Sequence, residues 1–107
     1  MTVQTRVVLH ALLEREPPAD ALYGLELVRT SGLLPGTVYP ILQRLRDAGW
    51  LSAHWEENEE AEAQGRPARK YYSLTTIGRA RAVHALAGTA REHTGLAWLL
   101  DGEGAPG

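Results

Sequence analysis

The sequence predicts a mainly α fold (α+β) in which three helices precede two strands and one further helix. Apolar residues recur three and four positions apart in four segments, which is the spacing of one helix face. Two short segments instead alternate or are rich in β-favouring tyrosine, as strands do. The helices are expected over Val3–Leu13, Ala21–Thr30, residues 38–48 and 76–100, and the strands over Trp50–Trp55 and Arg69–Leu74.

Short polar residues, prolines and glycines set the expected element ends. Asp20 is a suitable N-cap for the second helix, because its carboxylate can accept a hydrogen bond from a free backbone N–H. For the third helix we favour Thr37 as N-cap over a start at Pro35. That choice places Pro40 in the first turn, where the missing N–H of a proline is no loss. Gly49 suits the position just after that helix.

This order of elements is the layout of a winged helix-turn-helix. The short turn over residues 31–36 makes the second and third helices the helix-turn-helix pair, and the hairpin over residues 51–74 is the wing. Thr75 is expected to cap the final helix. We therefore expect a winged helix-turn-helix domain over residues 1–75, a C-terminal dimerisation helix over 76–100 and a disordered tail over 101–107.

Composition limits the function classes. The chain has 107 residues, 44% of them hydrophobic, and no cysteine. No apolar run approaches the ~20 residues that a membrane span needs, and no signal peptide is recognisable, so we expect a cytoplasmic protein without membrane contact. The four histidines lack metal-ligand spacing, and catalytic motifs are missing, so we expect no enzyme, no metal and no cofactor.

Charge is distributed unevenly along this chain of net charge −2. Residues 56–63 contain five glutamates and no base, whereas residues 64–91 contain six basic residues and no acid. Such a local positive field suits a phosphate backbone, although a solvated surface with compensating charges gives the same pattern. Because glutamates repel phosphates, we expect the acidic segment to be a solvated, disordered loop that points away from any nucleic acid.

Five sequence blocks together resemble the PadR family of winged-helix regulators. They are Leu22-Tyr23-Gly24-Leu25-Glu26-Leu27, Gly36-Thr37-Val38-Tyr39-Pro40-Ile41-Leu42-Gln43-Arg44-Leu45, Gly49-Trp50-Leu51, Gly65-Arg66-Pro67, and Lys70-Tyr71-Tyr72-Ser73-Leu74-Thr75 with Gly78. The resemblance extends from about Val7 to Ala82, and each block lies where the predicted fold needs it.

The resemblance implies a homodimer that binds a double-stranded DNA operator and usually represses transcription. In such proteins the third helix enters the major groove, and the wing contacts the minor groove or the backbone. Many members release DNA when a small aromatic or amphipathic effector binds. The chain ends after one C-terminal helix, as in the short subfamily.

Exposed positions of the third helix and the wing are the candidate DNA contacts. Thr37 and Gln43 have side chains that can read base edges, and Arg44 suits a phosphate. Tyr23 and Tyr39 have hydroxyls for a phosphate or groove contact, and plain packing with a solvated hydroxyl is the alternative for both. The full set of expected contacts is Tyr23, Thr37, Tyr39, Pro40, Gln43, Arg44, Arg66, Arg69 and Lys70.

The first and last helices carry more apolar surface than one small domain can cover. Dimerisation through both is the natural solution, with Val7, Val83, Leu86 and Ala90 as candidate contacts. Trp98 is a candidate for stacking on an effector, and packing in the dimer core is the alternative. The rival function is a winged helix that binds another protein instead of an operator, which the acidic segment favours.

Overall fold

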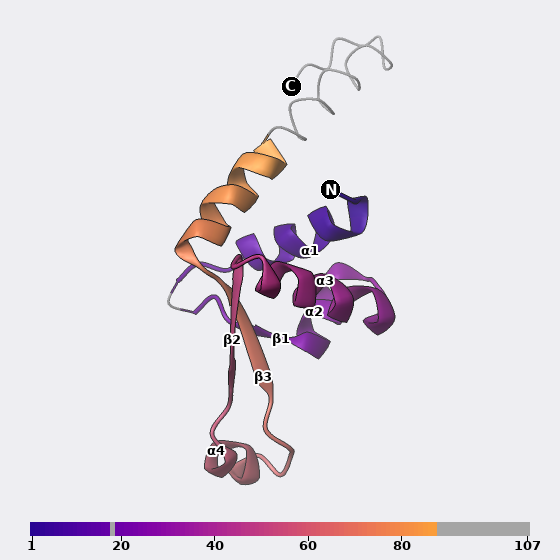
Figure 1. The fold of residues 1–107 in the computed structure, drawn as a ribbon. Helices are drawn as coiled ribbons and strands as arrows, with labels where there is room; N and C mark the ends of the chain where they lie inside the picture. Colours follow the sequence, from indigo (N-terminus) through magenta and orange to yellow (C-terminus); the bar gives the residue numbers. More distant parts are fainter. Residues whose placement is uncertain (18, 88–107) are drawn as a thin grey trace, which may run out of the picture.

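Three helices of the N-terminal half pack into one bundle (Figure 1). The computed structural model describes residues 1–17 and 19–87. The helices are α1 (Val3–Leu13), α2 (Gly24–Ser31) and α3 (Pro35–Asp47). Gly32 ends α2 in the left-handed conformation at φ 73°, which a glycine adopts without a Cβ penalty. The predicted end of the second helix at Thr30 is therefore confirmed to within one residue.

A three-stranded antiparallel sheet lies beside the bundle. Its strands are β1 (Leu22–Tyr23), β2 (Leu51–Trp55) and β3 (Lys70–Leu74), in the order β1-β3-β2. The register of the wing pairs Leu51 with Leu74 and Trp55 with Lys70. The β2–β3 hairpin extends away from the helices, and α4 (Asn58–Ala63) lies at its far end (Figure 1).

A C-terminal helix begins after Thr75 and is described over residues 76–87. Thr75 caps it as predicted, because its Oγ1 accepts a hydrogen bond from the Gly78 N–H at 2.9 Å. The same hydroxyl donates to the Gly49 carbonyl at 2.8 Å, which ties this helix to the end of α3. Ala82 is fully buried and Leu86 packs against the core, so one face of the helix completes the domain.

The core follows the predicted apolar stripe of α3. Val38, Ile41, Leu42 and Leu45 are all buried, as their spacing indicates. They meet the buried face of α1 and the inner face of the sheet. The other main core residues are Val8, Leu9, Leu12, Leu22, Leu27, Leu51, Tyr72 and Leu74.

The predicted starts of α2 and α3 are wrong. Asp20 caps no helix. Instead Leu22 and Tyr23 pair with β3, and α2 begins only at Gly24. Helix α3 begins at Pro35, not after Thr37. Proline is favoured at the first helical position, and Pro40 is accommodated inside the helix.

The expectation of a disordered acidic loop is also wrong. Residues 58–63 form α4, and Ala61 within it is 1% exposed. Glutamate and alanine are both good helix formers, which explains the helix despite its charge. The glutamates of α4, which are Glu59, Glu60 and Glu62, are exposed to solvent.

The predicted fold class is confirmed, because three helices, a wing and a following helix occur in the expected order. Ala90, Trp98 and the tail over 101–107 lie outside the described residues. Within residues 1–17 and 19–87, no helix is long and apolar enough to cross a membrane.

Candidate nucleic-acid interface

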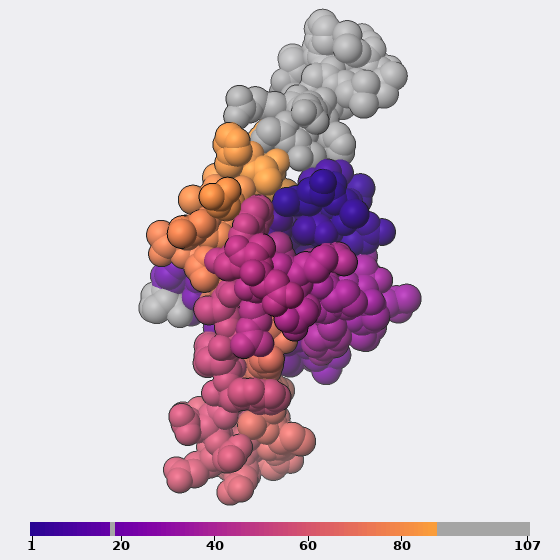
Figure 2. Space-filling view, viewed as in Figure 1, coloured from indigo at the N-terminus to yellow at the C-terminus, as the bar shows by residue number. Residues whose placement is uncertain are grey.

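A cleft of about 460 Å³ lies between the α2–α3 pair and the part of the wing where β2 and β3 meet the wing loop. Figure 2 shows the wing protruding from the body of the molecule below the helices. The cleft gathers five of the nine predicted contact residues from three separate elements and the wing loop. Its lining includes Tyr23, Arg29, Tyr39, Trp55, Arg66, Arg69, Lys70 and Tyr72. Basic groups thus alternate with aromatic rings along one surface.

Tyr39 is held in the cleft by close contact with Gly24. A Cβ placed on Gly24 would lie 2.5 Å from Cε1 and 2.6 Å from the hydroxyl oxygen of Tyr39. Gly24 is buried at the start of α2, whereas the Tyr39 side chain is 45% exposed. The ring of Tyr39 therefore rests on the α2 backbone and leaves part of its surface to solvent.

Tyr23 and Arg69 form a second contact across the cleft. The Arg69 guanidinium carbon lies 4.0 Å from the centroid of the Tyr23 ring, within the range of a cation–π interaction. Tyr71 meets the same ring edge-on with centroids 5.8 Å apart, because β1 and β3 are paired at this position. The stack fixes the Arg69 head group without neutralising its charge.

Lys70 and Trp55 lie opposite each other where β2 and β3 end. The Lys70 ammonium is 5.7 Å from the Trp55 ring centroid and 5.9 Å from that of Tyr72. Burial raises the pKa of Tyr72, with a smaller contribution from Tyr39, so its phenol stays neutral at physiological pH. The Trp55 side chain is 64% exposed.

Sequence reasoning missed Arg29 as a lining residue. It lies on α2, one turn after Leu25, and both side chains face the cleft. The helical spacing of these two positions was the available signal.

The exposed face of α3 presents the predicted base-reading positions. Thr37, Pro40 and Arg44 line a shallow hollow of about 240 Å³ near the start of α1. Gln43 is exposed, but its amide nitrogen donates a hydrogen bond to the Asp47 carboxylate at 2.9 Å. Two-point contact with adenine uses the amide oxygen and one N–H, and the second N–H of this amide can keep the bond to Asp47.

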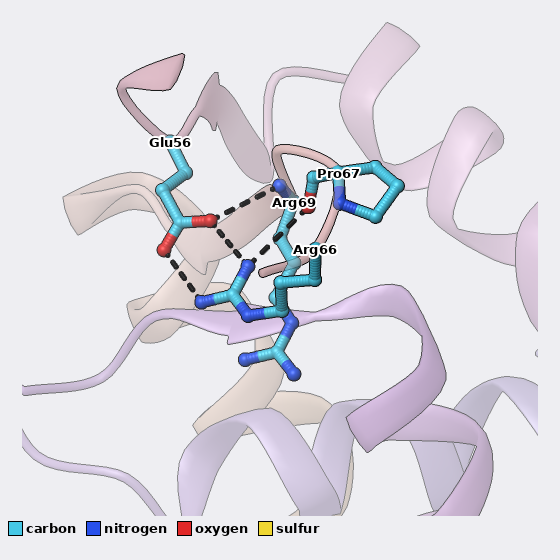
Figure 3. Close-up of polar contacts among 4 residues, drawn as sticks. All are labelled: Glu56, Arg66, Pro67 and Arg69. Atoms are coloured by element: carbon cyan, nitrogen blue, oxygen red, sulfur yellow. Dashed lines mark hydrogen bonds and ion pairs between the residues drawn. The ribbon is translucent and has the colours of Figure 1, made fainter. Parts of the chain in front are cut away.

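Arg66 is engaged by Glu56, the first residue of the acidic segment (Figure 3). Its Nη1 and Nη2 donate to the two carboxylate oxygens at 2.5 and 2.9 Å, which is a bidentate ion pair. The hydrogen bond from Arg66 holds the pKa of the Glu56 carboxyl below its usual value. Glu56 was expected to point away from nucleic acid with its neighbours, and sequence reasoning missed this pairing.

Three of the five candidate dimer or effector residues lie within the described chain. Leu86 packs against the core, Val7 is half-buried on α1, and Val83 is 53% exposed. Ile77, on the same helix as Val83, is 63% exposed. Val83 and Ile77 therefore leave apolar surface on the C-terminal helix.

The sequence matches the model of the transcriptional regulator PadR-like family over residues 8–84. The match spans more than half of the chain and covers all the elements that line the cleft. The protein belongs to the PadR-like family of transcriptional regulators. The resemblance noted from the five sequence blocks is thus confirmed, and the family is one of regulators rather than enzymes. No curated protein sequence matches the chain at a significant level.

Solved structures of other proteins share this fold. A PadR family transcriptional regulator from Eggerthella lenta is 27% identical, with a TM-score of 0.66 over 90% of this chain and 80% of that one. A PadR family regulator from Clostridium difficile is 17% identical, with a TM-score of 0.74 over 92% and 99%. BpsR from Bordetella bronchiseptica, whose DNA binding is regulated by 6-hydroxynicotinic acid, is 23% identical, with a TM-score of 0.68 over 92% and 65%.

Metal-ligating side chains do not gather in the described part of this PadR-like chain. No group of three or more histidine, aspartate or glutamate residues within residues 1–17 and 19–87 is placed to hold an ion. The cleft is lined by basic, aromatic and hydroxyl groups, which suit recognition of a polar, anionic partner.

Proposed function

We propose that this PadR-like regulator binds a specific double-stranded DNA operator as a homodimer and represses transcription from it. The observation that carries the proposal is the cleft, where Arg29, Arg69 and Lys70 lie among tyrosines beside the exposed face of α3. In this arrangement α3 enters the major groove and reads bases through Thr37 and Gln43. The wing contacts the phosphate backbone through Arg69 and Lys70, at the loop end of β3.

The net charge of −2 does not oppose this proposal. Fields of exposed charges are screened beyond ~8–10 Å at physiological salt, so the charges near the phosphates decide binding. The cleft lining contains basic residues and no acidic residue. The exposed glutamates of α4 lie at the far end of the wing, away from α3 (Figure 1).

A homodimer follows from the apolar surface and from the symmetry of operators. Val7 on α1, with Val83 and Leu86 on the C-terminal helix, are the described residues that we assign to the interface. Ala90, outside the described residues, extends this assignment. A two-fold dimer presents two α3 helices to half-sites about one helical turn, ~34 Å, apart. Analytical ultracentrifugation should give twice the mass of the chain.

A small aromatic or amphipathic effector is a further part of the proposal. BpsR shares this fold and is regulated by 6-hydroxynicotinic acid, which supports control of the same kind here. Trp98, outside the described residues, remains our candidate for stacking on such a molecule.

Selection of bound sequences from a random DNA pool tests the proposed function. We expect one enriched, two-fold symmetric site, and a steep loss of affinity with rising salt, because phosphate contacts release counterions. If no sequence is enriched and no binding occurs at low salt, the operator-binding function is rejected. The acidic α4 then favours the alternative of a winged helix that binds a basic protein surface.

Gln43→Ala should change which bases the protein selects. Because Gln43 reaches from the exposed face of α3, we expect discrimination at one base pair of each half-site to fall by about 1–3 kcal/mol. Asp47→Asn is the matched variant, since it weakens the tether on Gln43 without removing the amide. Unchanged base preference in Gln43→Ala, measured by competition with single-substitution operators, contradicts the assignment.

Gly24→Ala should lower operator affinity while leaving the stability of the fold nearly unchanged. The new methyl group displaces the far end of the Tyr39 side chain, which can rotate away, so we expect the melting temperature to change little. Operator affinity should fall about tenfold, which is the loss of roughly one charge-assisted hydrogen bond to phosphate. If affinity is retained, or if Tyr39→Phe binds as the wild type does, the Tyr39 hydroxyl makes no DNA contact.

A further inference from the structure

The wing loop is closed, one step beyond the last β2–β3 pair, by a set of bonds centred on Glu56. The carboxylate accepts two hydrogen bonds from the Arg66 guanidinium, and its Oε1 also accepts the Arg69 N–H at 3.3 Å. The Glu56 N–H in turn donates to the Arg69 carbonyl at 2.8 Å. Figure 3 shows the bonds of the Glu56 carboxylate to the Arg66 guanidinium and to the Arg69 N–H.

This set of bonds, which we call the clip, fixes the backbone of Arg69, whose guanidinium lines the cleft. It continues the β2–β3 ladder one step beyond the Trp55–Lys70 pair, so that Arg69 enters β3 with a defined orientation. The Arg69 guanidinium then lies on the Tyr23 ring at the edge of the cleft. The position of the Arg69 head group therefore depends on the Glu56 carboxylate, although the two side chains do not bond to each other.

Arg66 itself is poorly available to a phosphate. The two ends of its guanidinium that would grip a phosphate in bidentate fashion are held by Glu56. The side chains of Arg66 and Glu56 are only 23% and 10% exposed, which is low for an ion pair on a hairpin. A phosphate would have to replace a carboxylate that already neutralises the charge and that also bonds the Arg69 N–H.

We propose that Glu56 and Arg66 are positioning residues that pre-form the wing, and that Arg69 and Lys70, not Arg66, are its phosphate contacts. The inference rests on the proposed function and narrows it. It revises the sequence-based expectation that all three basic residues touch DNA. Pre-forming the wing lowers the ordering cost that DNA binding would otherwise carry.

Two rival roles predict different results. If Glu56 instead competed with DNA for Arg66, Glu56→Gln would bind DNA more tightly than the wild type. If Arg66 bound a phosphate, Arg66→Ala would lower the slope of log affinity against log salt by about 0.9 for each phosphate that is no longer neutralised. A positioning pair lowers affinity at every salt concentration and leaves that slope unchanged.

The experiment measures operator affinity of the full chain by fluorescence anisotropy at several salt concentrations. We expect Glu56→Gln and Arg66→Ala each to weaken binding about fivefold at every salt concentration. Their plots of log affinity against log salt should be parallel to that of the wild type. Arg69→Ala should reduce the slope, by about 0.9 per protomer. The exchanged pair Glu56→Arg with Arg66→Glu should recover part of the affinity. Tighter binding by Glu56→Gln, or a reduced slope for Arg66→Ala, overturns the proposal.

A readout without DNA keeps this inference separate from the proposed function. Hydrogen exchange of the Arg69 amide should be faster in Glu56→Gln, because the neutral amide oxygen of glutamine accepts that N–H more weakly than the carboxylate does. Glu60→Gln, an exposed substitution on α4, is the matched control and should leave it unchanged. If the wild type fails to bind DNA, the proposed function is rejected. If the Arg69 amide of Glu56→Gln exchanges as slowly as that of the wild type, the positioning role of Glu56 is rejected.

The clip should also open in acid. The pKa of Glu56 is lowered in the folded state. Its ion pair with Arg66 therefore adds its full contribution to the stability of the wing at pH values above the ordinary glutamate pKa. It disappears as the pH falls from about 4.5 through the folded-state pKa. We expect Arg69 amide exchange to lose its dependence on Glu56 over that range. The wild type and Glu56→Gln should then exchange alike.

Discussion

Arg69→Ala combined with Lys70→Ala is expected to weaken binding to the operator and to unrelated DNA alike, on the order of a hundredfold. Both cations lie over aromatic rings near the loop end of the wing strands, and the ion pairs within residues 1–17 and 19–87 involve neither of them. Phosphate contacts carry little sequence information, which is why specific and non-specific affinity should fall together. The preferred operator sequence should not change.

The measurement is a salt series on two DNA duplexes, one with the operator and one without. Arg81→Ala is the matched control, because it removes an exposed positive charge from the C-terminal helix outside the cleft. We expect the control to weaken binding by at most a few-fold, since screening weakens distant charges. Equal effects in the control and in the double variant would show that total charge, and not the cleft, governs binding.

Gly78→Ala is expected to destabilise the fold more than any other single methyl group added to a glycine of the described chain. A Cβ at this position would lie 2.0 Å from the carbonyl oxygen of Trp50 and 2.7 Å from its Cα. These are backbone atoms, so relief requires the C-terminal helix to move away from the β2 end of the wing. We expect the free energy of unfolding to fall by about 3 kcal/mol, at the upper end of overpacking effects.

Chemical denaturation of Gly78→Ala and Gly36→Ala makes the comparison. Gly36 is also helical, but a Cβ there meets nothing within 4 Å. Alanine should therefore leave stability unchanged or raise it by up to about 1 kcal/mol, through higher helix propensity. If Gly78→Ala is as stable as Gly36→Ala, the packing of the C-terminal helix against Trp50 is not as described.

Local signals were enough to predict most elements. The apolar stripe from Val38 to Leu45 indicated α3, and all four of its residues are buried. Thr75 was identified as an N-cap because a hydroxyl residue precedes a helical pattern, and its Oγ1 accepts the Gly78 N–H. The strands of the wing were recognised to within one residue at each end. In each case the information lies within a few residues of the element.

Features that depend on distant partners were not predicted. β1 forms only because Leu22 and Tyr23 pair with residues of β3 some fifty positions later, so Asp20 was misread as a helix cap. Asp20 instead lies 3.4 Å from the Arg79 guanidinium. The start of α3 was misplaced because Pro40 was given more weight than the preference of Pro35 for the first helical position.

The sequence predicted most residues of the candidate site, but not which side chains bond to one another. Tyr23, Tyr39, Arg69 and Lys70 were named from the family resemblance, and the structure gathers them in one cleft. Whether each of them touches DNA stays a prediction. The ion pair of Glu56 with Arg66 joins residues ten positions apart across a hairpin loop. Treating the five glutamates as one solvated block hid the separate role of Glu56.

Amide chemical shifts of labelled protein during titration with the selected operator test the central claim most directly. We expect the largest changes at Thr37, Tyr39 and Gln43 on α3 and at Arg69 and Lys70 on the wing, with saturation at two chains per duplex. The exposed glutamates of α4 should shift little. Changes confined to α4 or to the C-terminal helix, with α3 unaffected, would contradict the account.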